Sequence, residues 1–148
     1  LFFPSTLANT RKGCTGVLMT RCKGHDPALA VIRGPISAEL FSQLPGTDKM
    51  PYNCELELRA KDASGRSNPH DYLYSKYPGE HSLYFEYEGA DSDDFFHNAV
   101  KSWNDGYYKT RSGLPVQLYQ PYGFGCAGVL NGQKSKVACV FGASLNKN

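Results

Sequence analysis

Two side chains of this sequence have types and spacing that suit acid–base chemistry, an imidazole and a carboxylate. His70 follows Asn68-Pro69, and Glu86 lies sixteen positions later within the aromatic segment 83–87. A carboxylate on an aromatic, apolar face is costly unless it has a partner, so Glu86 is a candidate for function. The alternative is that Glu86 alternates outward to water. Both of its neighbours are aromatic, so they do not decide between the two faces.

Such a pair suits the cleavage of RNA by its own 2′-hydroxyl group. The reaction needs a base for the 2′ proton, an acid for the 5′ leaving oxygen and a cation beside the phosphate. A carboxylate and imidazoles on the concave face of a sheet can do this without a metal. The sequence predicts no metal site and no cofactor, because it has no Cys-x-x-Cys pair and its four histidines are scattered.

Two segments have the pattern of helices that could support such a sheet. Residues 37–44 begin with Ser37 as N-cap and end at Pro45-Gly46. Residues 93–104 follow an acidic cluster, which favours a helix start. Apolar residues then recur at helical spacing, and we interpret this stripe as core packing: Phe95, Phe96, Ala99, Val100 and Trp103.

Short strands account for most of the remaining chain. The patterns predict strands at residues 15–20, 28–33, 55–59, 82–87, 115–119, 125–130 and 136–141, with the Asn131-Gly132 turn joining the last two. These elements predict an α+β fold in which a curved antiparallel β-sheet packs on helix. The length of 148 residues fits a single domain, residues 1–148.

The five cysteines indicate where the protein works. Without a metal-binding spacing they are best explained by disulfides, which implies an oxidising, secreted setting. An odd number predicts two disulfides and one unpaired cysteine. The net charge of +2 is compatible with a polyanionic partner but forms no basic stripe. No segment is long and apolar enough to span a membrane, so we expect no membrane partner, and we expect a monomer.

Several segments, in order, resemble the fungal guanyl-specific ribonucleases and ribotoxins. Residues 67–72 and 77–80 resemble the family's catalytic-histidine segment and base-recognition loop, and residues 84–87 its catalytic-glutamate strand. Residues 112–116 and 126–130 resemble its last long strands. The resemblance implies a microbial ribonuclease-like, disulfide-stapled fold with His70 and Glu86 as catalytic residues. It also implies that Tyr72, Tyr74, Tyr77 and Lys76 contact RNA. It further implies a bridge from Cys14 or Cys22 to Cys139. For the second bridge we expect Cys54 to pair with Cys126.

The departures from that family weaken its chemistry. Pro115 stands where the family has its phosphate-binding arginine, and Asn131-Gly132 stands where it has its second catalytic histidine. Lys76 cannot accept the guanine N–H bonds that a carboxylate accepts. Arg111 is the candidate replacement for the cation, and His81 or His97 for the missing acid.

The sequence therefore leads to three hypotheses on function. The first is a secreted fungal effector, a virulence protein with a ribonuclease-like fold and degenerate catalysis, which acts by binding RNA or a host protein. Whether it is an enzyme stays open. The second is an active ribonuclease or ribotoxin that cleaves RNA by 2′-hydroxyl attack. The third is a secreted protein-binding module.

Overall fold

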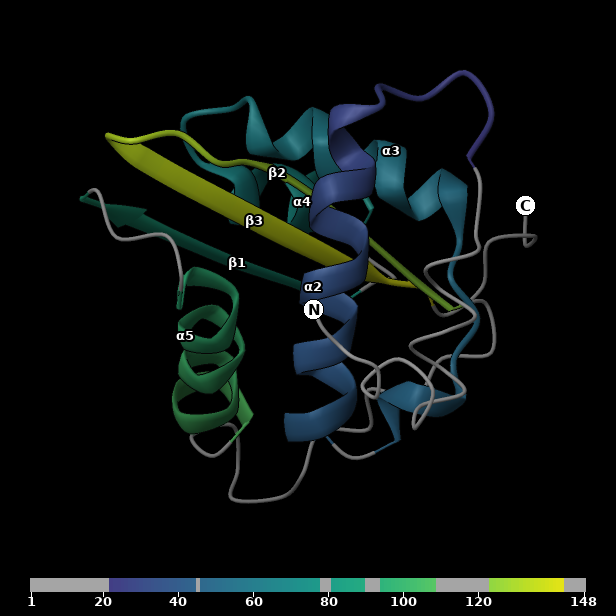
Figure 1. Cartoon of the computed structure of the whole chain (residues 1–148). Coiled ribbons are helices and arrows are strands. Elements are labelled where there is room, and N and C mark those ends of the chain that lie inside the picture. Colours follow the sequence, from purple (N-terminus) through teal and green to yellow (C-terminus); the bar gives the residue numbers. More distant parts are fainter. Residues whose placement is uncertain (1–21, 45, 78–80, 90–93, 109–122, 143–148) are drawn as a thin grey trace.

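The computed structural model shows a sheet covered by helices on both of its faces. The structure describes residues 22–44, 46–77, 81–89, 94–108 and 123–142. Three antiparallel strands lie in the order β1-β3-β2, with α2 and α5 in front of the sheet and α3 and α4 behind it (Figure 1). The helices and strands are α2 (Ala28–Gln43), the 3₁₀ turn η3 (Thr47–Lys49), α3 (Cys54–Ser64), α4 (Pro69–Lys76), β1 (His81–Glu88), α5 (Phe95–Ser102), the π-helical turn η4 (Trp103–Tyr108), β2 (Phe124–Val129) and β3 (Lys134–Phe141).

Each face of the sheet has its own hydrophobic cluster, because side chains alternate along a strand. Val137 and Cys139 of β3 pack in a cluster with α2 and α5, whereas Ala138 and Val140 pack in a cluster with α3 and α4. Leu29, in the first turn of α2, belongs to the cluster on the α3 side. The beginning of α2 therefore reaches past the β2 edge toward α3.

Helix α2 begins nine residues earlier than the sequence predicted. The segment 28–33 was expected to be a strand, but it forms one helix with residues 34–43, and Pro35 lies inside that helix. Leu29, Ile32, Ile36 and Leu40 are all buried on one side of it. Their helical spacing over three turns outweighs the strand preference of a short β-branched run.

Helix α3 replaces a second predicted strand, at residues 55–59. The side chain of Asn53 caps the helix by accepting hydrogen bonds from the backbone N–H groups of Glu55 (2.8 Å) and Leu56 (3.2 Å). Leu56, Ala60 and Ala63 lie buried against the sheet. The strand prediction was wrong because alternation over five residues does not distinguish a strand from the first turns of a capped helix.

The other local patterns are found as expected or lie outside the described residues. The predicted strands near 82–87, 125–130 and 136–141 form β1, β2 and β3, and the helix predicted over 93–104 forms α5 and the start of η4. The carbonyl oxygen of the Asn131 side chain accepts from the N–H groups of Gln133 and Lys134 and so shapes the hairpin turn. The predicted strands at 15–20 and 115–119 lie outside the described residues. Among those described, no helix is long and apolar enough to cross a membrane.

Two disulfides join neighbouring elements, and neither has the expected pairing. Cys22 bonds Cys54 at the start of α3, and Cys126 bonds Cys139 directly across β2 and β3. The expected bridge to Cys139 from Cys14 or Cys22 is excluded by the second of these, and the expected Cys54–Cys126 bridge by both. Cys14 lies outside the described residues.

Peptide mapping of the unreduced protein should recover the pairs Cys22–Cys54 and Cys126–Cys139. Replacing Cys22 and Cys54 together by serine should lower the free energy of unfolding by about 3–4 kcal/mol, because the bridge closes a loop over a sequence separation of 32 residues. Urea denaturation measures this loss. Recovery of a peptide that links Cys22 to Cys139 would contradict the assignment.

Candidate functional site

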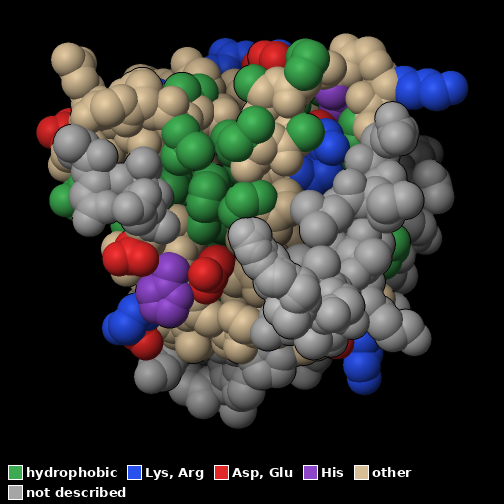
Figure 2. Space-filling view, viewed as in Figure 1, with side chains coloured by type: hydrophobic (Ala, Val, Ile, Leu, Met, Phe, Trp, Pro, Cys, Tyr) green, Lys and Arg blue, Asp and Glu red, His purple; other side chains and the backbone are tan. Residues whose placement is uncertain are grey.

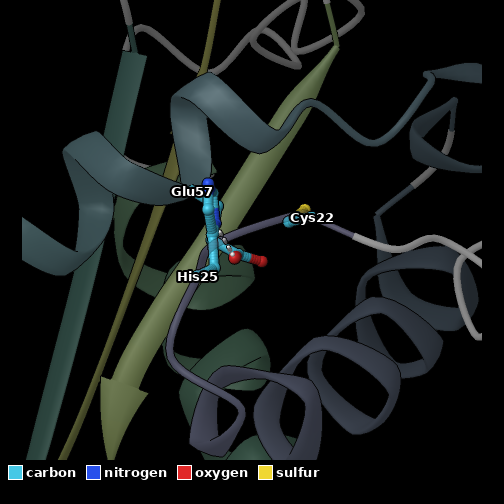
Figure 3. A group of neighbouring side chains, drawn as sticks. All are labelled: Cys22, His25 and Glu57. Atoms are coloured by element: carbon cyan, nitrogen blue, oxygen red, sulfur yellow. Dashed lines mark hydrogen bonds and ion pairs between the residues drawn. The ribbon is translucent and has the colours of Figure 1, made fainter.

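A fully buried carboxylate lies where α2, α3 and β2 meet. Glu57, in the first turns of α3, has no exposed surface. Its Oε1 accepts from Nε of Arg33 (2.9 Å) and from the hydroxyl of Tyr52, and its Oε2 accepts from Nη2 of Arg33 (3.0 Å) and from Nδ1 of His25 (2.7 Å). Figure 3 shows the contact between His25 and Glu57. We call His25, Arg33, Tyr52 and Glu57 the Glu57 network.

Each donor of the Glu57 network comes from a different part of the chain. His25 lies in the loop before α2, Arg33 in the second turn of α2, and Tyr52 in the segment before α3. The Tyr52 hydroxyl also accepts from the backbone N–H of Cys126 in β2 (3.1 Å). The Cys22–Cys54 disulfide lies beside the network and joins the chain before His25 to the first residue of α3. These contacts fix the beginning of α2 and the beginning of α3 relative to the edge of the sheet.

The hydrogen bonds keep Glu57 ionised despite its burial. Burial alone would raise the pKa of this carboxyl, but the hydrogen bonds from Arg33, Tyr52 and His25 outweigh burial and hold the pKa below its usual range. Burial and the neighbouring carboxylate raise the pKa of Tyr52, so its hydroxyl keeps its proton and donates it. Since a carboxylate only accepts, Nδ1 of His25 carries the proton in this contact.

Cys22, His25 and Glu57 lie close together but do not form a metal site. Donor atoms of Cys22, His25 and Glu57 lie within 4.8 Å of one another. However, the sulfur of Cys22 is bonded to Cys54 and is no thiolate, and His25 and Glu57 are bonded to each other. Arg33 occupies both oxygens of the carboxylate. The arrangement is that of a structural ion pair.

A groove opens at the edge of the sheet, between the elements that the Glu57 network joins. It has a volume of about 540 Å³, is open to solvent and is lined mostly by apolar atoms. Figure 2 shows hydrophobic side chains gathered in the middle of one face, over α2. We call it the edge groove, and its lining comes from the start of α2 and the loop before it (Asp26, Ala28, Leu29, Val31, Ile32), the end of α3 (Lys61, Ser64, Gly65) and the end of β2 (Gly128, Val129, Leu130).

One protein family matches most of the chain. Residues 22–141 match the family described as "ASPRs: Ancylostoma-associated secreted protein related". The chain belongs to this family. No significant match was found among curated proteins.

Three solved structures are similar to this ASPR chain at low identity. "Crystal Structure of Na-ASP-1" is 20% identical with a TM-score of 0.46, and the match covers 66% of this chain and 30% of that one, so the chain spans less than a third of Na-ASP-1. "Ancylostoma-secreted protein Ac-ASP-7" is 16% identical with a TM-score of 0.45, over 81% of this chain and 70% of that one. "Crystal structure of NaASP2 with Zn2+" is 17% identical with a TM-score of 0.42, over 74% and 73%.

Membership of the ASPR family corrects the predicted kinship. The chain is not a fungal ribonuclease, a ribotoxin or a ribonuclease-like fungal effector, and the predictions of a ribonuclease-like fold and of RNA binding were wrong. The resemblance rested on short segments, and one of them, residues 67–72, lies around the beginning of helix α4. The family's description and the two disulfides are consistent with the predicted extracellular setting.

The structure does not join the two residues predicted to be catalytic. His70 is exposed at the start of α4. Glu86 is exposed on β1, where it accepts from the hydroxyl of Tyr84 (2.8 Å) and pairs with Lys134 (3.1 Å). No hydrogen bond or ion pair links His70 to Glu86 within the described ranges. Arg111 lies outside them.

Three of the four residues predicted to contact RNA do come together on α4 and just after it. Nζ of Lys76 lies 5.5 Å from the ring centre of Tyr72 and 5.8 Å from that of Tyr77. The guanidinium of Arg66 lies over the ring of Tyr72 at 4.0 Å. Cations of the chain itself therefore lie against these rings. Tyr74 is 70% exposed and points to solvent.

The sequence patterns do not identify Arg33 and Glu57, which fix the elements that border the edge groove. Glu57 was assigned to an alternating strand, and Arg33 to the end of an apolar one. One signal could have found Arg33, since a charged side chain inside the apolar run 28–36 requires a buried partner. Nothing in the local pattern identifies Glu57 as that partner, because 24 residues separate the two.

Replacing Glu57 by glutamine should lower the free energy of unfolding by about 3–5 kcal/mol, because the cation of Arg33 then stays buried without its counter-charge. Urea denaturation at neutral pH measures the loss. Glu55→Gln is the matched control on the same helix, and because Glu55 is exposed we expect a change under about 0.5 kcal/mol. Equal effects of the two substitutions would disprove a stabilising role for the Glu57 network.

The lowered pKa of Glu57 also predicts a loss of stability in acid. The folded protein binds fewer protons than the unfolded chain near and below the ordinary carboxyl value of 4.5. The stabilisation is therefore complete above that pH and disappears as the pH falls through the folded pKa. Denaturation between about pH 6 and pH 3 should show a steeper fall for the unmodified protein than for Glu57→Gln. The exposed Glu86, substituted in the same way, should leave the slope nearly unchanged.

Proposed function

We propose that this ASPR protein is secreted and acts as a binding protein that takes an apolar group of a partner protein into the edge groove. The observation that carries the proposal is the groove itself, an open concavity of about 540 Å³ with a mostly apolar lining. Concave, mainly apolar sites with a few polar groups are the usual form of binding sites in proteins.

Apolar side chains exposed around the edge groove support this role. Val31 is 63% exposed, Val129 49% and Leu130 37%. They come from two different elements, and all three line the groove. Contiguous exposed apolar surface of this kind marks interaction sites more often than isolated exposed residues do. Covering it gains roughly 25 cal/mol per Å² of apolar surface.

The Glu57 network makes the edge groove a formed site before any partner arrives. It holds the beginning of α2 and the beginning of α3 through charged hydrogen bonds, and β2 through Tyr52. A site that is already shaped binds with a smaller loss of conformational entropy. Asp26 and Lys61 place one charge of each sign in the lining, so the groove selects mainly by shape and apolar contact.

Titration with the neutral apolar dye Nile red tests the proposal. We expect saturable, one-to-one binding, because the edge groove offers one concave apolar site. Val31→Asp should weaken binding at least ten-fold by placing a carboxylate in the lining. Leu58→Asp is the matched control, since Leu58 is 46% exposed on α3 and does not line the groove. Equal binding by the two variants would refute the groove as the binding site.

A further inference from the structure

The outer edge of β2 is covered along its first half. Cys126 and Cys139 lie opposite each other with their Cα atoms 4.1 Å apart, a separation typical of a pair that does not exchange hydrogen bonds. The N–H and C=O groups of Cys126 therefore point away from β3. The Tyr52 hydroxyl lies on that side, 3.1 Å from both the nitrogen and the oxygen of Cys126.

The segment before α3 also covers the edge of β2 at Phe124, two residues before Cys126. The N–H of Phe124 donates to the carbonyl oxygen of Pro51 (3.1 Å), and the carbonyl oxygen of Phe124 accepts from the N–H of Asn53 (2.7 Å). Tyr52 pairs with Phe124 in a parallel bridge. Residues 51–53 thus act as a short extra strand beside the first half of β2.

Among the described residues, nothing covers the edge of β2 at Gly128, two residues after Cys126. Backbone groups alternate along a strand, so those of Gly128 point outward like those of Phe124 and Cys126. No hydrogen bond to them from outside the β2–β3 pair is found within the described part of the chain, and Gly128 lines the edge groove. A side chain cannot shield this edge, because a Cβ atom on Gly128 would lie 2.0 Å from the carbonyl oxygen of Lys136.

We propose that the edge groove binds an extended peptide segment of the partner, which adds to β2 at Gly128. This inference rests on the proposed function and names the chemistry of the partner. The N–H and C=O of one peptide residue pair with those of Gly128, in line with the segment 51–53. An aliphatic side chain of the peptide enters the groove between α2 and α3. Addition of a strand to a free sheet edge gives affinity through the backbone and specificity through side-chain pockets.

The shape of the edge groove suits this occupant. The first turn of α2 reaches past the β2 edge toward α3, so the groove follows the edge of the sheet. Leu29 and Ile32 are nearly fully buried in its lining and offer an apolar floor for one side chain. Val129, the last residue of β2, and Leu130 after it extend the apolar surface. A free aliphatic ligand would use this apolar surface and leave the polar groups of Gly128 without a partner.

The probe is a linear decapeptide selected from a random display library against the intact, oxidised protein, with counter-selection on Val31→Asp. We expect a selected peptide to lose at least ten-fold in affinity when one backbone nitrogen, that of the residue paired with Gly128, is methylated. Methylation of the nitrogen on either side of it should have little effect, because neighbouring N–H groups of an extended peptide point in opposite directions. Equal sensitivity at all positions, or at none, overturns the inference, as does failure to select any peptide.

Amide hydrogen exchange of the ¹⁵N-labelled protein gives an independent measurement. The Gly128 amide should exchange at least ten-fold more slowly when the peptide is bound. The amide of Ala127, which faces β3, is the internal control and should change little. Nile red should leave Gly128 unchanged. If the protein binds Nile red but no peptide, the inference is refuted and the proposed function stands. If the protein does not bind Nile red, both are refuted.

Discussion

The carboxylate of Glu57 has no exposed surface, and its ionised state depends on four hydrogen bonds from three side chains. An isolated buried charge would cost many kcal/mol, so the fold is stable only when these donors are in place. They come from the loop before α2, from α2 itself and from the segment before α3. The carboxylate therefore couples the positions of elements that local sequence leaves independent.

The rest of the architecture follows from that constraint and from the sheet. α2 crosses the front of the sheet, while its first turn reaches the α3 side, where Leu29 joins the second hydrophobic cluster. Gly125 permits the close approach of α3 to β2, because a Cβ atom there would lie 2.3 Å from the backbone nitrogen of Glu57. The two disulfides hold the same neighbourhood, one at the start of α3 and one across β2 and β3. The edge groove is what remains open between these fixed walls.

The edge groove combines exposed apolar residues with an unpaired stretch of strand edge, and neither feature alone would indicate a binding site. Exposed apolar residues are common on protein surfaces, and so are short free stretches of strand edge. Here they adjoin, since Gly128 and Val129 belong both to the β2 edge and to the groove lining. A partner that offers a backbone and an aliphatic side chain together can use both features. The family's description as secreted is consistent with an extracellular setting for this surface.

The sequence alone predicts the local elements with strong periodicity or turn chemistry, namely β1, the β2–β3 hairpin at Asn131 and the amphipathic α5, together with the presence of disulfides. It does not predict α3 or the first half of α2, because short apolar or alternating runs fit a strand and a helix equally well, whereas the helix predicted over 37–44 forms the second half of α2. It also gave a wrong family, since short motifs without long-range contacts do not define a fold. Tertiary packing alone sets which cysteines pair, which cation neutralises Glu57 and which strand edge is open among the described residues. Each of these depends on residues far apart in the chain that packing brings within a few ångströms.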